Sequence, residues 1–130
     1  MYYQNLEDGI MSAQISTMEG FWKNNFKHGK GTTFYETGKV AFEGTYEFGK
    51  RNGYGVSYYK NGNKSYEGFW KADIYANFGK LYYENGTLSL EGYFSNNRKN
   101  FKGNKYNMSG QKIYEGEMMN YKVTDSSMLI

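Results

Sequence analysis

Phe42 to Tyr66 reads FEGTYEFGKRNGYGVSYYKNGNKSY, and this stretch decides the fold because it spans one full turn of a sequence repeat. An apolar residue followed by Glu and Gly recurs in the same frame every 24 residues, five times in all. The five glutamates are Glu19, Glu43, Glu67, Glu91 and Glu115. A fixed period of about 20 to 50 residues is typical of one supersecondary unit stacked on copies of itself. We therefore predict a short repeat array.

The composition agrees with strands joined by tight turns. The 130 residues include 15 Tyr, 9 Phe and 17 Gly but no Pro, a balance that favours β-structure. The absence of Cys excludes disulfides and Cys-based zinc sites, and a net charge of +3 is too small to indicate nucleic-acid binding. The N-terminal residues MYYQNLEDG lack an apolar segment, so we expect no signal peptide.

Each repeat is predicted to be a β-hairpin. The pattern indicates a strand from Phe42 to Glu47, a polar loop over residues 48–54, a second strand from Gly55 to Lys60 and a shorter turn at Asn61-Gly62. Two short connections in each repeat require antiparallel neighbours. The predicted fold class is therefore all-β, an elongated single-layer antiparallel sheet of stacked β-hairpins.

The period also predicts the domain organisation. Residues 1–17 form an N-terminal cap, residues 18–120 form the array, and residues 121–130 form a C-terminal tail. The array divides into the repeats 18–41, 42–65, 66–89 and 90–113 and the half repeat 114–120. Because an open sheet has two unpaired edges, the first segment and the apolar end of the tail, residues 128–130, are the expected caps.

Aromatic residues fall into files down the array. The main file shares one face of the sheet with the repeated glycines, and we expect each of those glycines to lie beneath a ring from the next strand. We predict that a partner protein binds either to this aromatic face, by packing on Trp22, Tyr46, Trp70 and Phe94, or to the edges of the sheet, by strand addition. Ile74 and Tyr75 make the loop of the third repeat apolar; they either fold back onto the sheet or form a second contact.

Charged residues form two further patterns. The predicted long loops carry a basic rim, which either is solvated or meets anionic lipid headgroups or an acidic partner. The residues of this rim are Lys27, Lys30, Lys50, Arg51, Arg98, Lys99 and Lys102. The repeated glutamates are predicted to lie about 10 Å apart, which does not match a glycosidase pair. We expect them to bind turn amides or neighbouring lysines, or else a basic stripe on a partner.

No catalytic, cofactor or metal site can be assembled from this sequence. His28 is the single His, so neither a zinc site nor a Ser-His-Asp triad has its ligands. The Gly-x-Gly pairs lack the strand-to-helix context and the Lys-Ser/Thr of a phosphate-binding loop. We therefore expect a protein that is not an enzyme and has no cofactor.

The repeated unit resembles the MORN repeat (membrane occupation and recognition nexus). The resemblance rests on MEGFWKN at 18–24 with Gly29 and Gly31, on Phe42-Glu43-Gly44 with Gly53 and Gly55, and on YEGFW at 66–70. It implies an elongated, non-catalytic array of hairpins, of the kind that scaffolds ciliary and cytoskeletal assemblies, links membranes or accompanies lipid kinases. The 24-residue period is one residue longer than the usual spacing and resembles variant forms of protists and bacteria. Asn77 and Phe101 stand where the first two repeats have Gly.

These observations predict a structural subunit that binds other proteins of a larger, ciliary or cytoskeletal complex in the cytoplasm. One alternative is a peripheral membrane module that uses the basic loops to bind anionic lipids. The other alternative is an antitoxin or immunity-type binding protein of bacteria.

Overall fold

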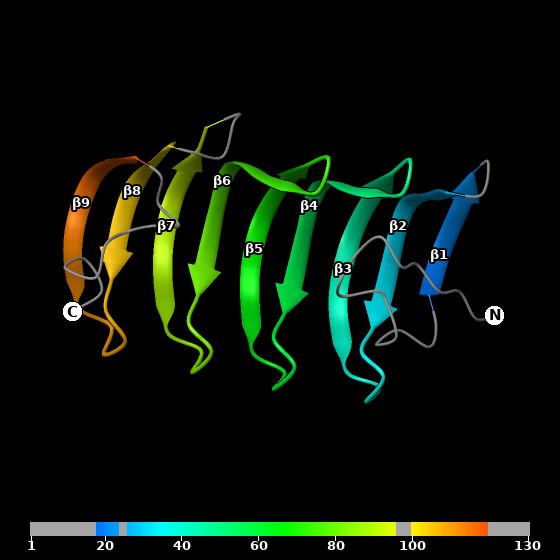
Figure 1. Ribbon diagram of the computed structural model, residues 1–130, viewed down its shortest axis with the longest axis horizontal. Helices are drawn as coiled ribbons and strands as arrows, with labels where there is room; N and C mark the ends of the chain where they lie inside the picture. Colours follow the sequence, from blue (N-terminus) through cyan, green and yellow to red (C-terminus); the bar gives the residue numbers. More distant parts are fainter. Residues whose placement is uncertain (1–17, 24–25, 96–99, 120–130) are drawn as a thin grey trace.

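The chain forms one open antiparallel sheet (Figure 1). The computed structural model describes residues 18–23, 26–95 and 100–119, and of residues 18–25 it describes no side chains. Nine strands in these ranges lie in chain order. They are β1 (Met18–Lys23), β2 (Phe26–Phe34), β3 (Val40–Glu47), β4 (Lys50–Tyr58), β5 (Lys64–Lys71), β6 (Ile74–Tyr82), β7 (Leu88–Phe94), β8 (Asn100–Tyr106) and β9 (Lys112–Met119).

The architecture confirms the predicted fold class. Every neighbouring pair is antiparallel, and β1 and β9 lie at opposite ends of a single row of strands (Figure 1). No helix occurs in the described ranges. The predicted caps, residues 1–17 and 121–130, lie outside these ranges.

The predicted loop lengths were wrong for the second and third repeats, because there the first connection is the shorter one. Only Phe48 and Gly49 separate β3 from β4, and both have positive φ (51° and 84°). Ala72 and Asp73 join β5 to β6 in the same way, with φ of 49° and 71°. Two central residues with positive φ match the twist of a hairpin. Residues 50–54, predicted as loop, are therefore strand.

The second connection is a five-residue turn, as at Tyr59–Asn63 between β4 and β5. The amide of Tyr59 donates to the carbonyl of Asn63 (2.8 Å), and the amide of Gly62 donates back to the carbonyl of Tyr59 (2.9 Å). Gly62 has a φ of 97°, a conformation that Gly adopts without steric cost. The repeated Asn-Gly signal was thus correctly assigned to a turn, although Gly alone carries the positive φ.

A row of glycines crosses the whole sheet and shapes the core. Glycine pairs with glycine between every two neighbouring strands. The row consists of Gly20, Gly31, Gly44, Gly55, Gly68, Gly79, Gly92, Gly103 and Gly116. A β-carbon on Gly55 would run into the ring of Phe42, and one on Gly79 would run into the ring of Tyr66. The rings therefore lie flat over backbone that has no side chains of its own.

One detail of that packing differs from the prediction. Phe42 lies two residues before Gly44 on the same strand, and its ring tip is 2.9 Å from the place of a β-carbon there. The covering ring thus comes from the glycine's own strand and reaches across to Gly55 on the next one. At Gly92 the covering ring is that of Phe101 on the next strand, as predicted. Because rings of the same repeat lie over its glycines, a single-layer sheet buries Phe42 and Tyr66 without a second layer.

The departures at Asn77 and Phe101 have different structural consequences. Asn77 has a φ of 53° and adopts the left-handed conformation of Gly29 and Gly53 (81° and 94°), which Asn tolerates better than most residues. Phe101 instead pairs directly with Phe94 in a ladder without a register shift, and its ring is buried 4.8 Å from that of Phe94. The fourth repeat therefore replaces a backbone bulge with an additional core ring.

Candidate functional site

The core face is the side of the sheet that carries Phe42, Tyr46, Tyr66, Trp70 and Phe94. Its side chains form one buried cluster in which Tyr46, Trp70 and Phe94 are each about 5% exposed or less. These three residues were predicted to bind a partner, and their burial gives them a structural role in the core. The side chain of Trp22 lies outside the described residues. Whether this file also binds a partner stays a prediction.

Cations cover the rings of the core face. The Lys27 ammonium lies 4.7 Å from the centre of the Tyr46 ring, and the Arg51 guanidinium lies 4.6 Å from that of Trp70, which are cation–π distances. Asp73 accepts hydrogen bonds from Nε and from the backbone N–H of Arg51, both at 2.8 Å. Arg51 therefore ties the second hairpin to the turn of the third.

These positions correct the predicted basic rim. Lys27 and Arg51 belong to strands and lie over the core, and Lys27 is buried. Lys30 and Lys102 are exposed in the middle of β2 and β8, whereas Lys50 begins β4. Arg98 and Lys99 lie outside the described residues. The described basic residues therefore lie on strands rather than together along a row of loop ends, and lipid binding stays a prediction.

Tyr75 folds back onto the sheet, which was one of the two alternatives considered for the third repeat. Its ring stacks on that of Tyr66 with centres 4.0 Å apart and planes 13° apart, and it meets Trp70 edge-on at 5.0 Å. Ile74 begins β6 and is half-buried. Tyr75 thus covers Trp70 as Arg51 does, with a ring in place of a cation.

The opposite side, called here the open face, carries exposed rings that the sequence analysis did not select. Tyr54, Phe69 and Tyr93 are 49%, 40% and 62% exposed. Tyr54 meets Phe69 edge-on at 5.6 Å, and Phe78 meets Tyr93 in the same way at 5.3 Å. The alternation of side chains could have found them, because Phe69 and Tyr93 each follow the repeated Glu-Gly and so share the glutamate's face.

The repeated glutamates of the open face accept hydrogen bonds from tyrosines. Tyr58 donates its hydroxyl to Glu43 (2.7 Å), and Tyr106 donates to Glu91 (3.1 Å). Glu67 accepts from both Tyr82 (2.9 Å) and Tyr54 (3.2 Å). The prediction of lysine partners is confirmed at Glu67 and Glu115, which bind Lys64 and Lys112. The structure shows tyrosine hydroxyls where turn amides were expected.

This network shifts the acidities of its members. Burial and the bond to Glu43 raise the pKa of Tyr58 to about 12, and burial and Glu67 raise the pKa of Tyr82 well above its ordinary value. Burial pushes the pKa of Glu67 up, but hydrogen bonds from Tyr82, Lys64 and Tyr54 together hold it below its usual range. Glu67 therefore remains charged at neutral pH, while Tyr58 and Tyr82 remain protonated donors.

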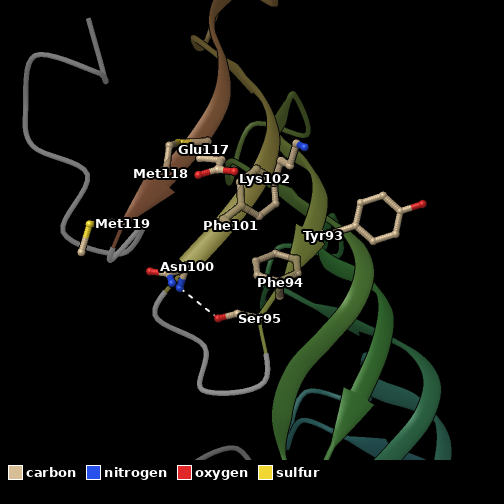
Figure 2. A pocket seen from close by; sticks show the side chains of 9 residues that line it. All are labelled: Tyr93, Phe94, Ser95, Asn100, Phe101, Lys102, Glu117, Met118 and Met119. Atoms are coloured by element: carbon tan, nitrogen blue, oxygen red, sulfur yellow. Dashed lines mark hydrogen bonds between the residues drawn. The ribbon is translucent and has the colours of Figure 1, made fainter.

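A shallow hollow lies at the β9 end of the sheet (Figure 2). It measures about 470 Å³, and its lining includes Phe94, Phe101, Met118 and Met119. Figure 2 shows the Phe94 and Phe101 rings close together, whereas the backbone N–H of Asn100 donates to Ser95 Oγ (3.1 Å). The hollow therefore holds apolar and hydrogen-bonding groups.

The described ranges hold neither a candidate metal site nor a membrane-spanning helix. Among these residues, no group of three or more His, Asp or Glu side chains is placed to hold a metal ion. Within the same ranges, no helix has the length and apolar character needed to cross a membrane.

Stacked hairpins, a repeated Glu-Gly pair and a continuous row of glycines define a repeat protein of the β-hairpin class. The MORN repeat family model matches three consecutive stretches, residues 19–40, 42–64 and 66–88, which together make up just over half of the chain. The chain belongs to the MORN repeat family. These repeats serve in general as non-enzymatic scaffolds that bind proteins or membranes.

A curated relative supports the same assignment. The chain is 35% identical over 51 residues to MORN repeat-containing protein 3 of Xenopus laevis, and the match covers 39% of this chain. It covers 21% of the relative, so this chain spans about a fifth of that protein's length.

Proposed function

We propose that this chain is a non-catalytic MORN scaffold that binds another protein across its open face. The observation that carries the proposal is the exposure of Tyr54, Phe69 and Tyr93 on three different strands of one face. Large exposed aromatic residues are enriched at protein interfaces, where they supply much of the binding energy. The core face is less suited to this role because its rings are already covered by side chains of the chain itself.

The chemistry of the open face indicates what kind of surface it would bind. Its rings alternate with carboxylates whose partners hold them in fixed positions, such as Glu43 with Tyr58 and Glu67 with Tyr82. A partner with apolar groups between hydrogen-bond donors would match this alternation. The rigid sheet presents the side chains without a large ordering cost on binding.

Quantitative pull-down from native extract tests this function. The double variant Phe69→Ser/Tyr93→Ser removes exposed rings while leaving the core cluster intact, and we expect it to lose the proteins that the wild type retains. Met108→Ser removes an exposed apolar side chain in the turn between β8 and β9 and is the matched control. If the double variant folds and retains every wild-type partner, the open face is not the binding surface.

The cellular setting of the scaffold is part of the same proposal. Ciliary and cytoskeletal assemblies are the setting that the family resemblance favours, in the cytoplasm of a protist-like cell. Tagged protein expressed in ciliated cells tests this part, with enrichment along axonemes or basal bodies as the expected result. A uniform cytosolic distribution that the Phe69→Ser/Tyr93→Ser variant shares would contradict it.

A further inference from the structure

The last strand of the sheet ends the row of glycines with one side unpaired. In the part of the chain that the structure describes, β9 pairs with β8 and has no other neighbour. A β-carbon on Gly68, inside the sheet, would lie 2.7 Å from the Phe78 carbonyl oxygen on the following strand. The atoms nearest to one on Gly116 belong to Tyr114, at 3.5 Å or more. In the described part of the chain, no backbone of a following strand therefore lies beside the end of the row.

The exposure of Tyr114 on the core face also reflects that no described strand follows β9. It occupies the position of Phe42, Tyr66 and Leu90, which are 1%, 0% and 3% exposed, yet it is 39% exposed itself. Its hydroxyl donates to the Glu117 carbonyl (2.7 Å), as that of Tyr66 donates to the Phe69 carbonyl (2.9 Å). The ring is therefore already placed as in an interior repeat, and what differs is that no described strand follows it.

We infer that the outer edge of β9 is a second binding site, at which an extended segment of a partner protein adds a tenth antiparallel strand. An unpaired edge offers backbone N–H and C=O groups to such a segment. This site is separate from the open face because it binds by backbone pairing rather than through exposed rings.

The interior strand pairs define the chemistry of the partner segment. Tyr66–Gly68 is one copy of the repeated apolar-Glu-Gly triplet, and its three residues pair with Leu81, Lys80 and Gly79. The equivalent triplet on β9 is Tyr114–Gly116, which ends at the same glycine position. Gly lies opposite this glycine in every interior pair, whereas the residue opposite the repeated Glu varies between Thr32, Val56, Lys80 and Asn104. The segment therefore carries Gly opposite Gly116. The exposed carboxylate of Glu115 favours the β6 form of the segment, with Lys or Arg opposite Glu115 and an apolar residue against Tyr114. Glu117, which is also exposed, adds a second negative charge that favours a basic segment.

A second copy of this chain does not supply that chemistry. Two β9 strands paired antiparallel through Gly116 would bring Glu115 of each copy opposite Glu117 of the other, and like charges directly opposite are destabilising. A copy that continued the array by translation would present β1, which runs in the same direction as β9, whereas every pair in this sheet is antiparallel. The fitting occupant is therefore a different protein with a Gly-basic-apolar segment.

The experiment uses the whole chain and a fluorescent peptide with the sequence of β6, IYANFGKLY, as the probe. Fluorescence anisotropy should show saturable binding that weakens about tenfold or more, roughly 1.4 kcal/mol, in the peptide Gly79→Val. Lys80→Glu in the peptide and Glu115→Lys in the protein should each weaken binding by a similar factor. The two charge changes together should restore it, which a general loss of folding cannot do.

Three outcomes would overturn the inference. They are no saturable binding of the β6 peptide, equal binding of the Gly79→Val peptide, and failure of the combined charge exchange to restore affinity. Light scattering of the protein alone provides a further test, because a stable dimer that the peptide dissociates would assign the edge to a second copy. The Phe69→Ser/Tyr93→Ser variant should bind the peptide like the wild type, so failure at the edge and failure of the open face are distinguishable.

Discussion

Replacing Gly55 with Ala tests whether rings lying over the glycine row stabilise the sheet. The new methyl would overlap the Phe42 ring, which is 1% exposed and has little room to move. Overpacking of this kind costs about 1–3 kcal/mol, and the lower backbone entropy of Ala offsets about 0.5–1 kcal/mol of that. We expect Gly55→Ala to lower the free energy of unfolding by about 0.5–2 kcal/mol.

The decisive measurement is a double-mutant cycle with Phe42→Ala. Phe42→Ala alone should cost about 3–5 kcal/mol because it leaves a cavity. In that background Gly55→Ala should be neutral or slightly stabilising, because the methyl enters space that the ring has left. The coupling energy should therefore be about 1–3 kcal/mol, measured by urea unfolding followed by circular dichroism.

Gly44→Ala is the matched control for this cycle. Its methyl would lie 2.6 Å from the Gly55 α-carbon and 2.7 Å from the Tyr54 carbonyl oxygen, and removing the ring leaves both backbone contacts in place. Its cost should therefore persist in the Phe42→Ala background. Additive costs of Gly55→Ala and Phe42→Ala, or an equally large coupling at Gly44, would refute the idea that the Phe42 ring is what requires glycine at position 55.

Three further predictions concern the links between repeats. Tyr59 donates its hydroxyl to the Tyr82 carbonyl in the next repeat at 2.5 Å, so Tyr59→Phe should cost about 1 kcal/mol in urea unfolding, and an unchanged midpoint would contradict this. Asp73→Asn keeps the left-handed turn but removes the charge facing Arg51; it should cost about 1 kcal/mol, and much less in an Arg51→Met background. Because the pKa of Tyr58 is about 12, raised by burial and Glu43, its stabilising contribution is complete below pH 10 and is lost as the pH rises from about 10 to 12. Glu43→Gln should lower that pKa in absorbance titrations at about 295 nm, with Tyr58→Phe assigning the signal, and an unshifted titration would exclude Glu43 as a cause.

The period of the sequence predicts the larger features of this fold. The step between Glu19 and Glu115 gave the number and order of the hairpins, and the alternation around Phe42 gave the core file. Loop lengths were less accessible, because a polar stretch such as residues 48–54 serves equally well as loop or as exposed strand. The unusual φ at Phe48 and Ala72 is what shortens those turns to two residues, and neither residue type signals it.

The binding surfaces were harder to predict than the fold, for a physical reason. A ring's exposure depends on what lies above it, and Trp70 and Phe69 are adjacent in the sequence but lie on opposite faces. Trp70 is covered by Arg51 and Tyr75 from neighbouring strands, whereas Phe69 meets Tyr54 edge-on and remains 40% exposed. Regular spacing in the sequence pointed to the file of Tyr46, Trp70 and Phe94 as the binding surface, and these regularly spaced rings are the ones buried in the core.

The glycine row explains how one layer of sheet can be stable and also what limits it. A sheet with side chains at every position needs a second layer to bury them, whereas here Phe42 and Tyr66 each lay a ring across the glycine of their own strand and that of the next. Stability then comes from adjacent repeats alone, as in other solenoids, so nothing in the packing sets the number of repeats. Among the described residues the row of glycines reaches β9, where the ring of Tyr114 lies half-covered. A partner that supplied a further glycine-bearing strand would extend the core and not merely contact its surface. Its binding should therefore raise the unfolding temperature of the array, and tighter binding should raise it further.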